Sequence, residues 1–301
     1  MSVTVGRPGM LTTVQDAGRK GSQHVGVPVA GPMDWWSLAA ANLLVGNVSD
    51  AAALEITLIG PELELSRDAI IAVTGATFEF TVSGRPGVMH RPQSVKAGER
   101  VTFGARVSGA RAYLAVDGGF AVPEVLGSRA THVRAGMGGH EGRPLRRGDV
   151  VPLGPASGAS ASPVSVEPPH LPLRDPVVLR AIAGPDDVPA AFWGQTFSIN
   201  PQSDRMGYRL DGAPLDVSGA HPSAGVAMGT VQVTPSGTCV LLMADRATSG
   251  GYARAATVIT ADLPLAGQAA PGDRIRFEPV DAAEAGEVLR QMRAHLPGAR
   301  S

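Results

Sequence analysis

Short apolar segments rich in β-branched residues recur along the whole chain, and turn sequences separate them. Segments of this length and composition are typical of buried strands. The chain has 38 glycines and 25 prolines but only 18% charged residues, a balance that favours many turns over long helices. We therefore expect a mainly β fold with few helices. The expected strands are residues 54–58, 69–73, 78–82, 100–103, 112–116, 177–183, 194–199, 226–233, 238–244 and 274–278.

Two segments have helical character. Residues 35–45 follow Asp34, which suits a helix N-cap, and they end at Gly46-Asn47, which suits a helix stop. Residues 281–296 place Val288, Leu289, Met292 and Leu296 on one stripe. We expect that stripe to pack against a sheet edge or a barrel mouth.

The segment 154–176 divides the chain into two expected domains. Its first part is small, polar and uncharged, and Pro168-Pro169 and Pro172 follow, a composition typical of a linker. We expect an N-terminal β-barrel-like domain over 1–155, a linker over 156–176, and a C-terminal barrel with a terminal helix over 177–301. A Gly-Asp turn feeds a final strand in both halves, which hints that the two halves are similar.

Composition also narrows the functional classes. The net charge of −1 and the 4% aromatic content argue against a nucleic-acid surface. Cys239 is the single cysteine and sits in an apolar run, which predicts a buried, inert thiol in a cytosolic protein without disulfides. No signal pattern or membrane-spanning run is apparent, and the seven histidines show no metal-ligand spacing, so we expect no membrane and no metal site.

Three polar clusters stand out, at residues 12–34, 200–210 and 245–252, and the last follows the apolar run 239–244 directly. Each combines acidic, basic and hydroxyl residues with nearby glycines, which let the backbone approach a ligand closely. Arginine suits a site for carboxylates or a developing oxyanion, because its planar fork binds both and stays charged. The candidate catalytic residues are Asp204, Arg205, Asp245 and Arg246. The candidate substrate-binding residues are Thr12, Thr13, Gln15, Asp16, Arg19, Ser203, Gln232, Thr248, Gly250, Gly251 and Tyr252.

The same residues also suit a structural interpretation. Buried ion pairs fix loop geometry, and Asp and Thr side chains often cap turns. Adjacent strand residues point to opposite faces, so the members of one Asp-Arg pair need not share a pocket. The glycine-rich segment 134–143 lacks the Lys-Ser/Thr signature of a phosphate loop and is more typical of a lid or a partner-facing loop. The residues alone leave these alternatives open.

Collinear motifs along residues 3–277 resemble one family. They include Leu11-Thr12-Thr13-Val14-Gln15-Asp16-Ala17-Gly18-Arg19, Ala41-Asn42-Leu43-Leu44-Val45-Gly46-Asn47, Ala53-Leu54-Glu55-Ile56-Thr57, Tyr113-Leu114-Ala115-Val116-Asp117-Gly118-Gly119-Phe120, Leu126-Gly127-Ser128-Arg129, Ser203-Asp204-Arg205-Met206-Gly207 and Gly229-Thr230-Val231-Gln232-Val233. This family is called allophanate hydrolase subunit 2, biotin-dependent carboxyltransferase of the KipA type, or the C-type subunit of 5-oxoprolinase.

The resemblance implies two cyclophilin-like β-barrel domains and a heteromeric enzyme acting on a small amide. It implies a KipI-like partner chain, which is also known as allophanate hydrolase subunit 1 or the B-type 5-oxoprolinase subunit. For some members it implies a third chain, either the A-type 5-oxoprolinase subunit or a biotin carboxylase.

The resemblance leaves two reactions open, an ATP-dependent 5-oxoprolinase and a urea-carboxylase-like carboxyltransferase. ATP or carboxybiotin would then reach the site through partner chains, with no cofactor bound by this chain alone. The alternative is a regulatory protein that antagonises a KipI-like kinase inhibitor without catalysis.

Three positions depart from the family pattern. A Ser-Thr pair usually follows the Gly-Ser-Arg motif, but here the pair is Ala130-Thr131. The segment after residue 244 usually reads Asp-Arg-Gln-Thr-x-Gly-Gly-Tyr-Pro, but Ala247 replaces the Gln and Ala253 replaces the Pro. A missing carboxamide removes hydrogen-bond donors and an acceptor. The sequence therefore does not fix which amide is the substrate.

Overall fold

The computed structural model describes residues 1–156, 164–217 and 221–298. By its internal contacts the chain divides into two compact units. The first comprises Met1–Lys20, Ala30–Leu171 and Arg293–Ser301, and the second comprises Gly21–Val29 and Pro172–Met292. Most of the expected linker 156–176 is thus assigned to the first unit, and residues 157–163 of it lie outside the described residues.

The first unit is built on one nine-stranded sheet, which confirms the mainly β prediction for this half. The main path of the sheet runs β2-β3-β8-β4-β1-β9, and β5 pairs with β6, β7 and β8. Its elements are β1 (Ser2–Arg7), β2 (Leu11–Gln15), α1 (Trp35–Leu44), β3 (Ala53–Thr57), β4 (Glu62–Leu65), β5 (Ala69–Val82), β6 (Arg85–Pro86), β7 (Pro92–Val95), β8 (Arg100–Val116), the 3₁₀ turn Val133–Ala135 and β9 (Val150–Pro152).

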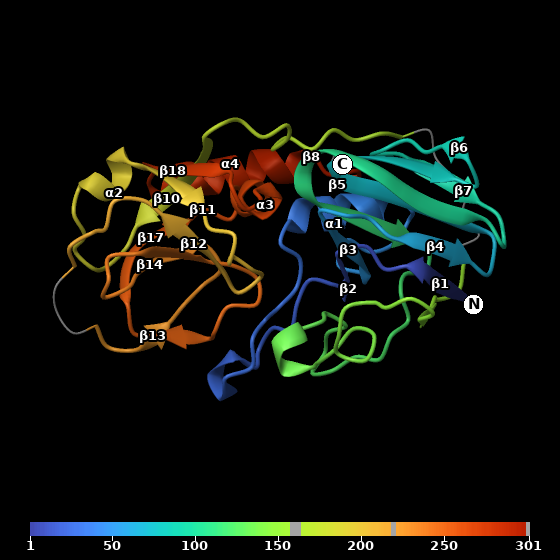
Figure 1. Ribbon diagram of the computed structural model, residues 1–301, viewed down its shortest axis with the longest axis horizontal. Coiled ribbons are helices and arrows are strands. Elements are labelled where there is room, and N and C mark those ends of the chain that lie inside the picture. Colours follow the sequence, from blue (N-terminus) through green and yellow to red (C-terminus); the bar gives the residue numbers. More distant parts are fainter. Residues whose placement is uncertain (157–163, 218–220, 299–301) are drawn as a thin grey trace. The chain divides into compact units, whose positions relative to one another are not determined.

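The long strands β5 and β8 dominate this sheet and run antiparallel side by side (Figure 1). The sequence predicts two short strands in the place of each one. The breaks that look like turns, around Gly75 and around residues 104–109, are instead register shifts within continuous strands. Gly75 has φ +83, which glycine adopts without strain inside such a bulge.

Both faces of this sheet are buried. Ile71 and Val73 of β5 join the main apolar core, whereas Ile70 and Ala72 on the opposite face contact the cluster that contains Leu38 of α1. This alternation follows from the period of two along a strand. Helix α1 lies against β3, β5 and β8, and its N-cap is Asp34 as expected: the carboxylate accepts from Ser37 N at 2.9 Å.

The second unit is a closed barrel in the strand order β10-β17-β14-β15-β12-β11-β18, which confirms the predicted barrel. Its strands are β10 (Val177–Ala183), β11 (Thr196–Ile199), β12 (Gly207–Asp211), β14 (Thr230–Val233), β15 (Cys239–Leu242), β17 (Ala253–Val258) and β18 (Arg274–Pro279). A separate two-stranded ladder joins β13 (Ala224–Gly225) to β16 (Ser249–Gly250). The remaining elements are the 3₁₀ turn Gln23–Val25, α2 (Ala191–Gly194), α3 (Leu263–Gln268) and α4 (Ala282–Ala294).

The strand expected over 226–233 begins only at Thr230. Gly229 has φ +90, and a Cβ at this position would lie 2.9 Å from Val258 O, so the chain turns here. The strand expected over 194–199 begins at Thr196, because α2 occupies the residues before it. Of the expected stripe, Met292 is buried and the other members are half-buried, and Leu296 lies beyond the end of α4 at Ala294.

Other family motifs have clear architectural roles. A Cβ on Gly118 would lie 2.0 Å from Pro155 O, so only glycine fits this turn. The Asp117 carboxylate accepts from Ile70 N at 3.0 Å and pairs with Arg67. Cys239 is buried as predicted, and burial raises the pKa of its thiol to about 12.

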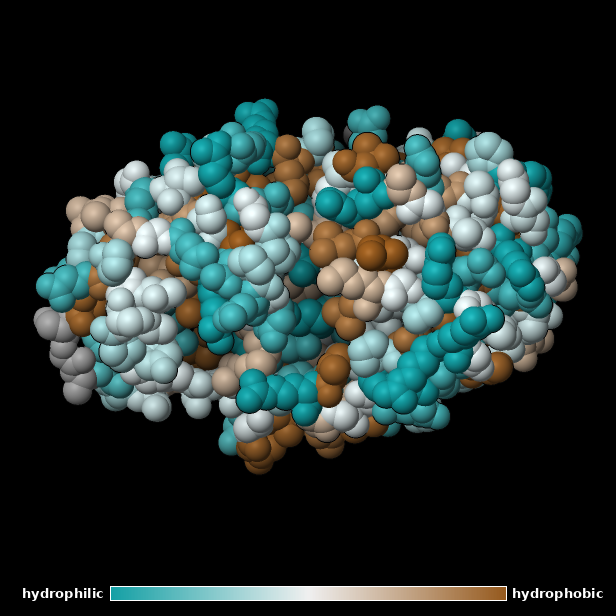
Figure 2. Space-filling view, viewed as in Figure 1, coloured by the Kyte–Doolittle hydropathy of each residue, from teal (hydrophilic) through white to brown (hydrophobic). Residues whose placement is uncertain are grey.

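The described part of the chain contains no helix both long and apolar enough to cross a bilayer. On the face drawn in Figure 2, hydrophobic residues lie scattered among hydrophilic ones.

Candidate functional site

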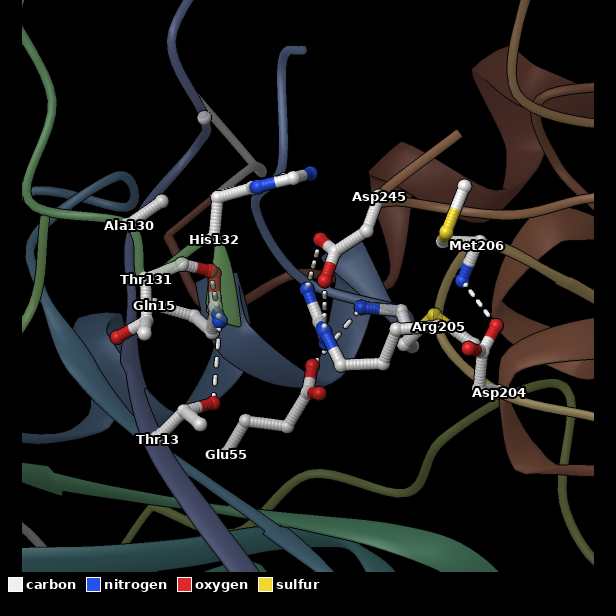
Figure 3. Close-up of polar contacts among 12 residues, drawn as sticks. Thr13, Gln15, Glu55, Ala130, Thr131, His132, Asp204, Arg205, Met206 and Asp245 are labelled. Carbon is white, nitrogen blue, oxygen red and sulfur yellow. Dashed lines mark hydrogen bonds and ion pairs between the residues drawn. The ribbon is translucent and has the colours of Figure 1, made fainter. Parts of the chain in front are cut away.

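Arg205 and Asp245 form a buried ion pair in the second unit (Figure 3). The guanidinium donates from Nε to Oδ2 and from Nη2 to Oδ1, both at 3.0 Å, and each side chain is 6% exposed. Backbone pairing beyond β12 and β15 places them, because Asp245 N donates to Arg205 O at 2.8 Å. This two-point geometry is the strong form of an arginine–carboxylate contact. The structure thus brings together one residue from each predicted Asp-Arg pair.

Asp204 lies apart from this pair. Its exposed carboxylate accepts from Met206 N at 2.8 Å and closes a local turn before β12 (Figure 3). Ser203 acts in the same turn, where its hydroxyl accepts from Arg209 N at 3.1 Å. Both side chains serve the local backbone, as Asp and Ser commonly do in turns.

Arg246 has a different environment. Its guanidinium is half-buried, and Nε donates to the carbonyl of Val226 at 3.2 Å. No carboxylate among the described residues pairs with it, and burial lowers its pKa. A half-buried cation whose protein partner is a neutral carbonyl is suited to an anionic or strongly polar ligand. Of the four candidate catalytic residues, Arg246 is the one best placed to bind such a group.

The segment 248–252 follows directly. Thr248 O accepts from Val226 N at 3.1 Å, and the β13–β16 ladder continues that pairing to Gly250. The Gln232 carboxamide packs against Gly250 so closely that a Cβ there would lie 2.5 Å from Gln232 Nε2. That nitrogen is buried and has no hydrogen-bond partner. Gly251 and Tyr252 are exposed.

The candidate residues near the N-terminus hold the first unit together. Gln15 Nε2 donates to Thr13 Oγ1 and to Thr131 O, both at 3.0 Å (Figure 3). Thr12 Oγ1 donates to Pro8 O at 2.6 Å. These bonds support the capped-turn interpretation for the two threonines. Gln15 Oε1 is buried without a partner, so one acceptor of this group is not used by the described residues.

Asp16 and Arg19 form hydrogen bonds to the segment that carries the Gly127-Ser128-Arg129 motif. Asp16 accepts from Ser128 Oγ at 2.6 Å, and Arg19 donates to Val125 O at 2.8 Å and to Ala130 O at 2.9 Å. A buried arginine that bonds to main-chain carbonyls fixes loop geometry.

A buried network surrounds the start of α1, and the sequence does not predict it. Asp34 bonds to His170 at 2.8 Å, and Tyr113 donates to Glu55 at 2.7 Å while accepting from Asp34 N at 2.8 Å. Burial and the neighbouring carboxylates raise the pKa of Tyr113. One sequence feature could have indicated this network, namely the charged residue Glu55 among the buried residues of a strand. His170 gives no such indication, because its partner lies 136 positions away.

A model of the carboxyltransferase domain, subdomain A and B, matches residues 25–279. The chain belongs to this family. It is similar to the C-type subunit of 5-oxoprolinase from Haemophilus influenzae, with 36% identity over 94% of this chain and 93% of that protein. It is also similar to the C-type subunit of 5-oxoprolinase from Escherichia coli, with 39% identity over 90% of this chain and 89% of that protein.

The same family fold occurs inside a longer enzyme. The crystal structure of the K. lactis urea amidolyase superposes with a TM-score of 0.91 at 31% identity and covers the whole of this chain. This chain spans 20% of that protein. This chain thus resembles subunits that it matches over most of their length and one part of a longer enzyme. These relatives support a role as an enzyme component.

Proposed function

We propose that this chain is the C-type component of a heteromeric enzyme that acts on a small amide together with a KipI-like chain. Its reaction is either ATP-dependent 5-oxoproline hydrolysis or carboxyl transfer of the urea-carboxylase kind. The observation that carries the proposal is the half-buried guanidinium of Arg246 in a carboxyltransferase family member. Its bonded protein partner is one neutral carbonyl, which leaves donors for a ligand.

Arg246 would bind a planar carboxylate or stabilise the negative charge that develops on an amide oxygen. Either role uses a fixed cation in a partly desolvated position, where electrostatic stabilisation is strong. The donor set suits the carboxyl group of carboxybiotin, which would supply activated CO₂ when a partner chain delivers it. Arg205, held by Asp245, would keep the adjoining backbone in place.

The proposal assigns ATP chemistry to another chain. In the present chain, the glycine-rich segment 134–143 lacks a phosphate-loop signature. A third chain, either an A-type 5-oxoprolinase subunit or a biotin carboxylase, would bring ATP or carboxybiotin.

The test is to co-purify the chain with the KipI-like protein and the third component from its gene neighbourhood. ATP turnover is then measured with 5-oxoproline, urea and related amides, with and without this chain. Amide-dependent turnover that needs this chain supports the proposal. A stable complex that is silent with every amide, and in which this chain reverses kinase inhibition by the KipI-like protein, would establish the regulatory alternative instead.

A further inference from the structure

Two buried nitrogen atoms without partners belong to one ring of contacts in the second unit. They are Nε2 of His221 and Nε2 of Gln232. Buried polar groups are normally hydrogen-bonded, and leaving one unpaired is costly. Two such atoms on residues that share contacts are candidates for binding a ligand that supplies the missing partners.

Asp186 lies beside the His221 ring. One carboxylate oxygen, Oδ2, accepts from Arg254 N at 2.9 Å and from Arg254 Nε at 3.1 Å. The other oxygen, Oδ1, lies 3.7 Å from His221 Nδ1. This distance is too long for a hydrogen bond, and in the tautomer protonated at Nδ1, the nitrogen nearer Asp186, Nε2 is a hydrogen-bond acceptor.

Gln232 belongs to the same group of contacts through Arg254 and Gly250. It lies opposite Arg254 in the β14–β17 ladder, so the two side chains leave the same face of the sheet. Its carboxamide packs on Gly250. The next residue, Gly251, lies beside Ser223 and the carbonyl of His221: a Cβ on Gly251 would be 3.2 Å from Ser223 Oγ and 3.5 Å from His221 O. The contacts return to His221.

The two free nitrogens are chemically complementary. In that tautomer Nε2 of His221 accepts a hydrogen bond, whereas Nε2 of Gln232 donates one. An amide group offers the matching pair, since its N–H donates and its carbonyl oxygen accepts. A carboxylate would satisfy Gln232 but offer His221 no proton, and a ketone would do the same.

We propose that His221 and Gln232 form the subsite that recognises the amide group of the substrate, with His221 bound to the amide N–H and Gln232 to its carbonyl oxygen. The inference rests on the proposed function, because it identifies the part of a small amide that each residue reads. Asp186 and Arg254 are positioning residues. Gly250 of the β13–β16 ladder and the following Gly251 add no side chains beside these residues.

The test compares two probes that differ in one group. The five-membered lactam 2-pyrrolidinone has both N–H and carbonyl, whereas cyclopentanone keeps the ring and the carbonyl but has no N–H. Titration of the full-length chain by ligand-observed NMR should show the lactam binding about tenfold more tightly, since a site built to bond an N–H rejects a ligand without one. Equal affinities, or no saturable binding of the lactam, would overturn the inference.

Single substitutions test which residues cause the tighter binding of the lactam. His221→Asn places its amide near the Nδ1 position and removes the acceptor at Nε2, so the lactam preference should vanish. His221→Gln extends an acceptor toward the Nε2 position and should keep the preference. Gln232→Leu should weaken the binding of both probes by the same factor.

The matched controls are His24→Ala, an exposed histidine, and Gln202→Leu, an exposed glutamine. Unchanged melting temperatures show that each variant is folded. A preference that persists in folded His221→Asn contradicts the assignment.

The experiments test the proposed function and this subsite independently of each other. If the complex turns over an amide but the chain alone shows no lactam preference, the subsite is wrong and the function stands. If the preference is present and depends on His221 but no complex turns over any amide, the function is wrong and the subsite stands as an amide-binding site.

Discussion

Single residues in the second unit show how a shared residue type is put to different uses. Arg205 and Arg246 both follow an aspartate, yet Arg205 bonds to a buried carboxylate at two points and Arg246 to one carbonyl. Removing them should therefore have different consequences. A loss at Arg205 leaves a charge without its partner in the interior, whereas a loss at Arg246 removes a cation from a partly accessible position.

Arg246→Ala should lower kcat/KM of the reconstituted complex by about 10- to 100-fold, the loss of one charge-assisted contact worth about 1.5–3 kcal/mol. Arg246→Lys should recover little of this, because a point charge cannot replace a planar fork. The melting temperature should stay within the range of the control Arg209→Ala, an exposed arginine of the same unit. Wild-type turnover by folded Arg246→Ala would reject a ligand-binding role.

Arg205→Ala should instead destabilise the chain, by about 3–5 kcal/mol, because it leaves the Asp245 carboxylate buried without its ion-pair partner. The double variant Arg205→Met, Asp245→Leu should lose less, since it removes both charges of this pair. Urea denaturation of the wild type, Arg205→Met, Asp245→Leu and the double variant measures the coupling. Additive losses, or an unchanged unfolding free energy in Arg205→Ala, would argue against a structural pair.

At the scale of elements, the start of α1 and the segment 164–171 meet in a titratable cluster of the first unit. His170 bonds to Asp34, the N-cap of α1, and Val166 N donates to His90 O at 3.1 Å. His90 itself has φ +60 and a buried Nδ1 without a partner. Burial, and then the neighbouring His170, lower the pKa of His90 to about 4, although Asp34 opposes the shift.

This cluster predicts that stability falls on acidification. Because the pKa of His90 is near 6.5 in the unfolded chain and about 4 in the folded one, the unfolded state binds more protons between those values. The contribution of His90 is therefore complete above pH 6.5 and declines as the pH falls toward 4, by at most about 3 kcal/mol.

Urea denaturation at pH 7.5 and pH 5 checks this prediction. His90→Asn removes the titrating ring and keeps a residue that tolerates the left-handed backbone. Its unfolding free energy should change less between the two pH values than that of the wild type. The exposed histidine variant His24→Ala should follow the wild type. If the unfolding free energies of the wild type and His90→Asn change equally between the two pH values, His90 is not the cause of the loss of stability.

At the scale of the whole molecule, the family comparison matters most. The two bacterial 5-oxoprolinase relatives match this chain over nearly their full length, and the urea amidolyase contains the same fold within a longer polypeptide. A chain that corresponds to one part of a larger enzyme is expected to work with separate partners.

We therefore expect a stable complex with the KipI-like chain from the same gene neighbourhood. Mixed at micromolar concentrations, the two proteins should co-elute in size-exclusion chromatography at a volume earlier than either alone. An unrelated β-barrel protein of similar mass provides the control. Elution as two separate species would contradict the prediction.

Local sequence determined the elements whose signals lie within a few residues. Asp34 followed by an alanine-rich run specified the start of α1, because a cap and its helix are adjacent in the chain. The predicted strand 177–183 has the observed bounds of β10. Alternating apolar residues and glycine–proline turns specified a mainly β chain, and the collinear motifs specified the family.

Tertiary structure decided the pairings between distant residues. Bulges carry β5 and β8 through glycines that look like turns, because the neighbouring strand can pair on both sides of the extra residue. The choice of Asp245 rather than Asp204 as the partner of Arg205 depends on how the chain pairs across 40 positions. The ring that joins Asp186, His221, Gln232 and Gly250 likewise depends on strand register. A one-residue slip of β14 would turn the Gln232 side chain to the opposite face, and no local pattern encodes that choice.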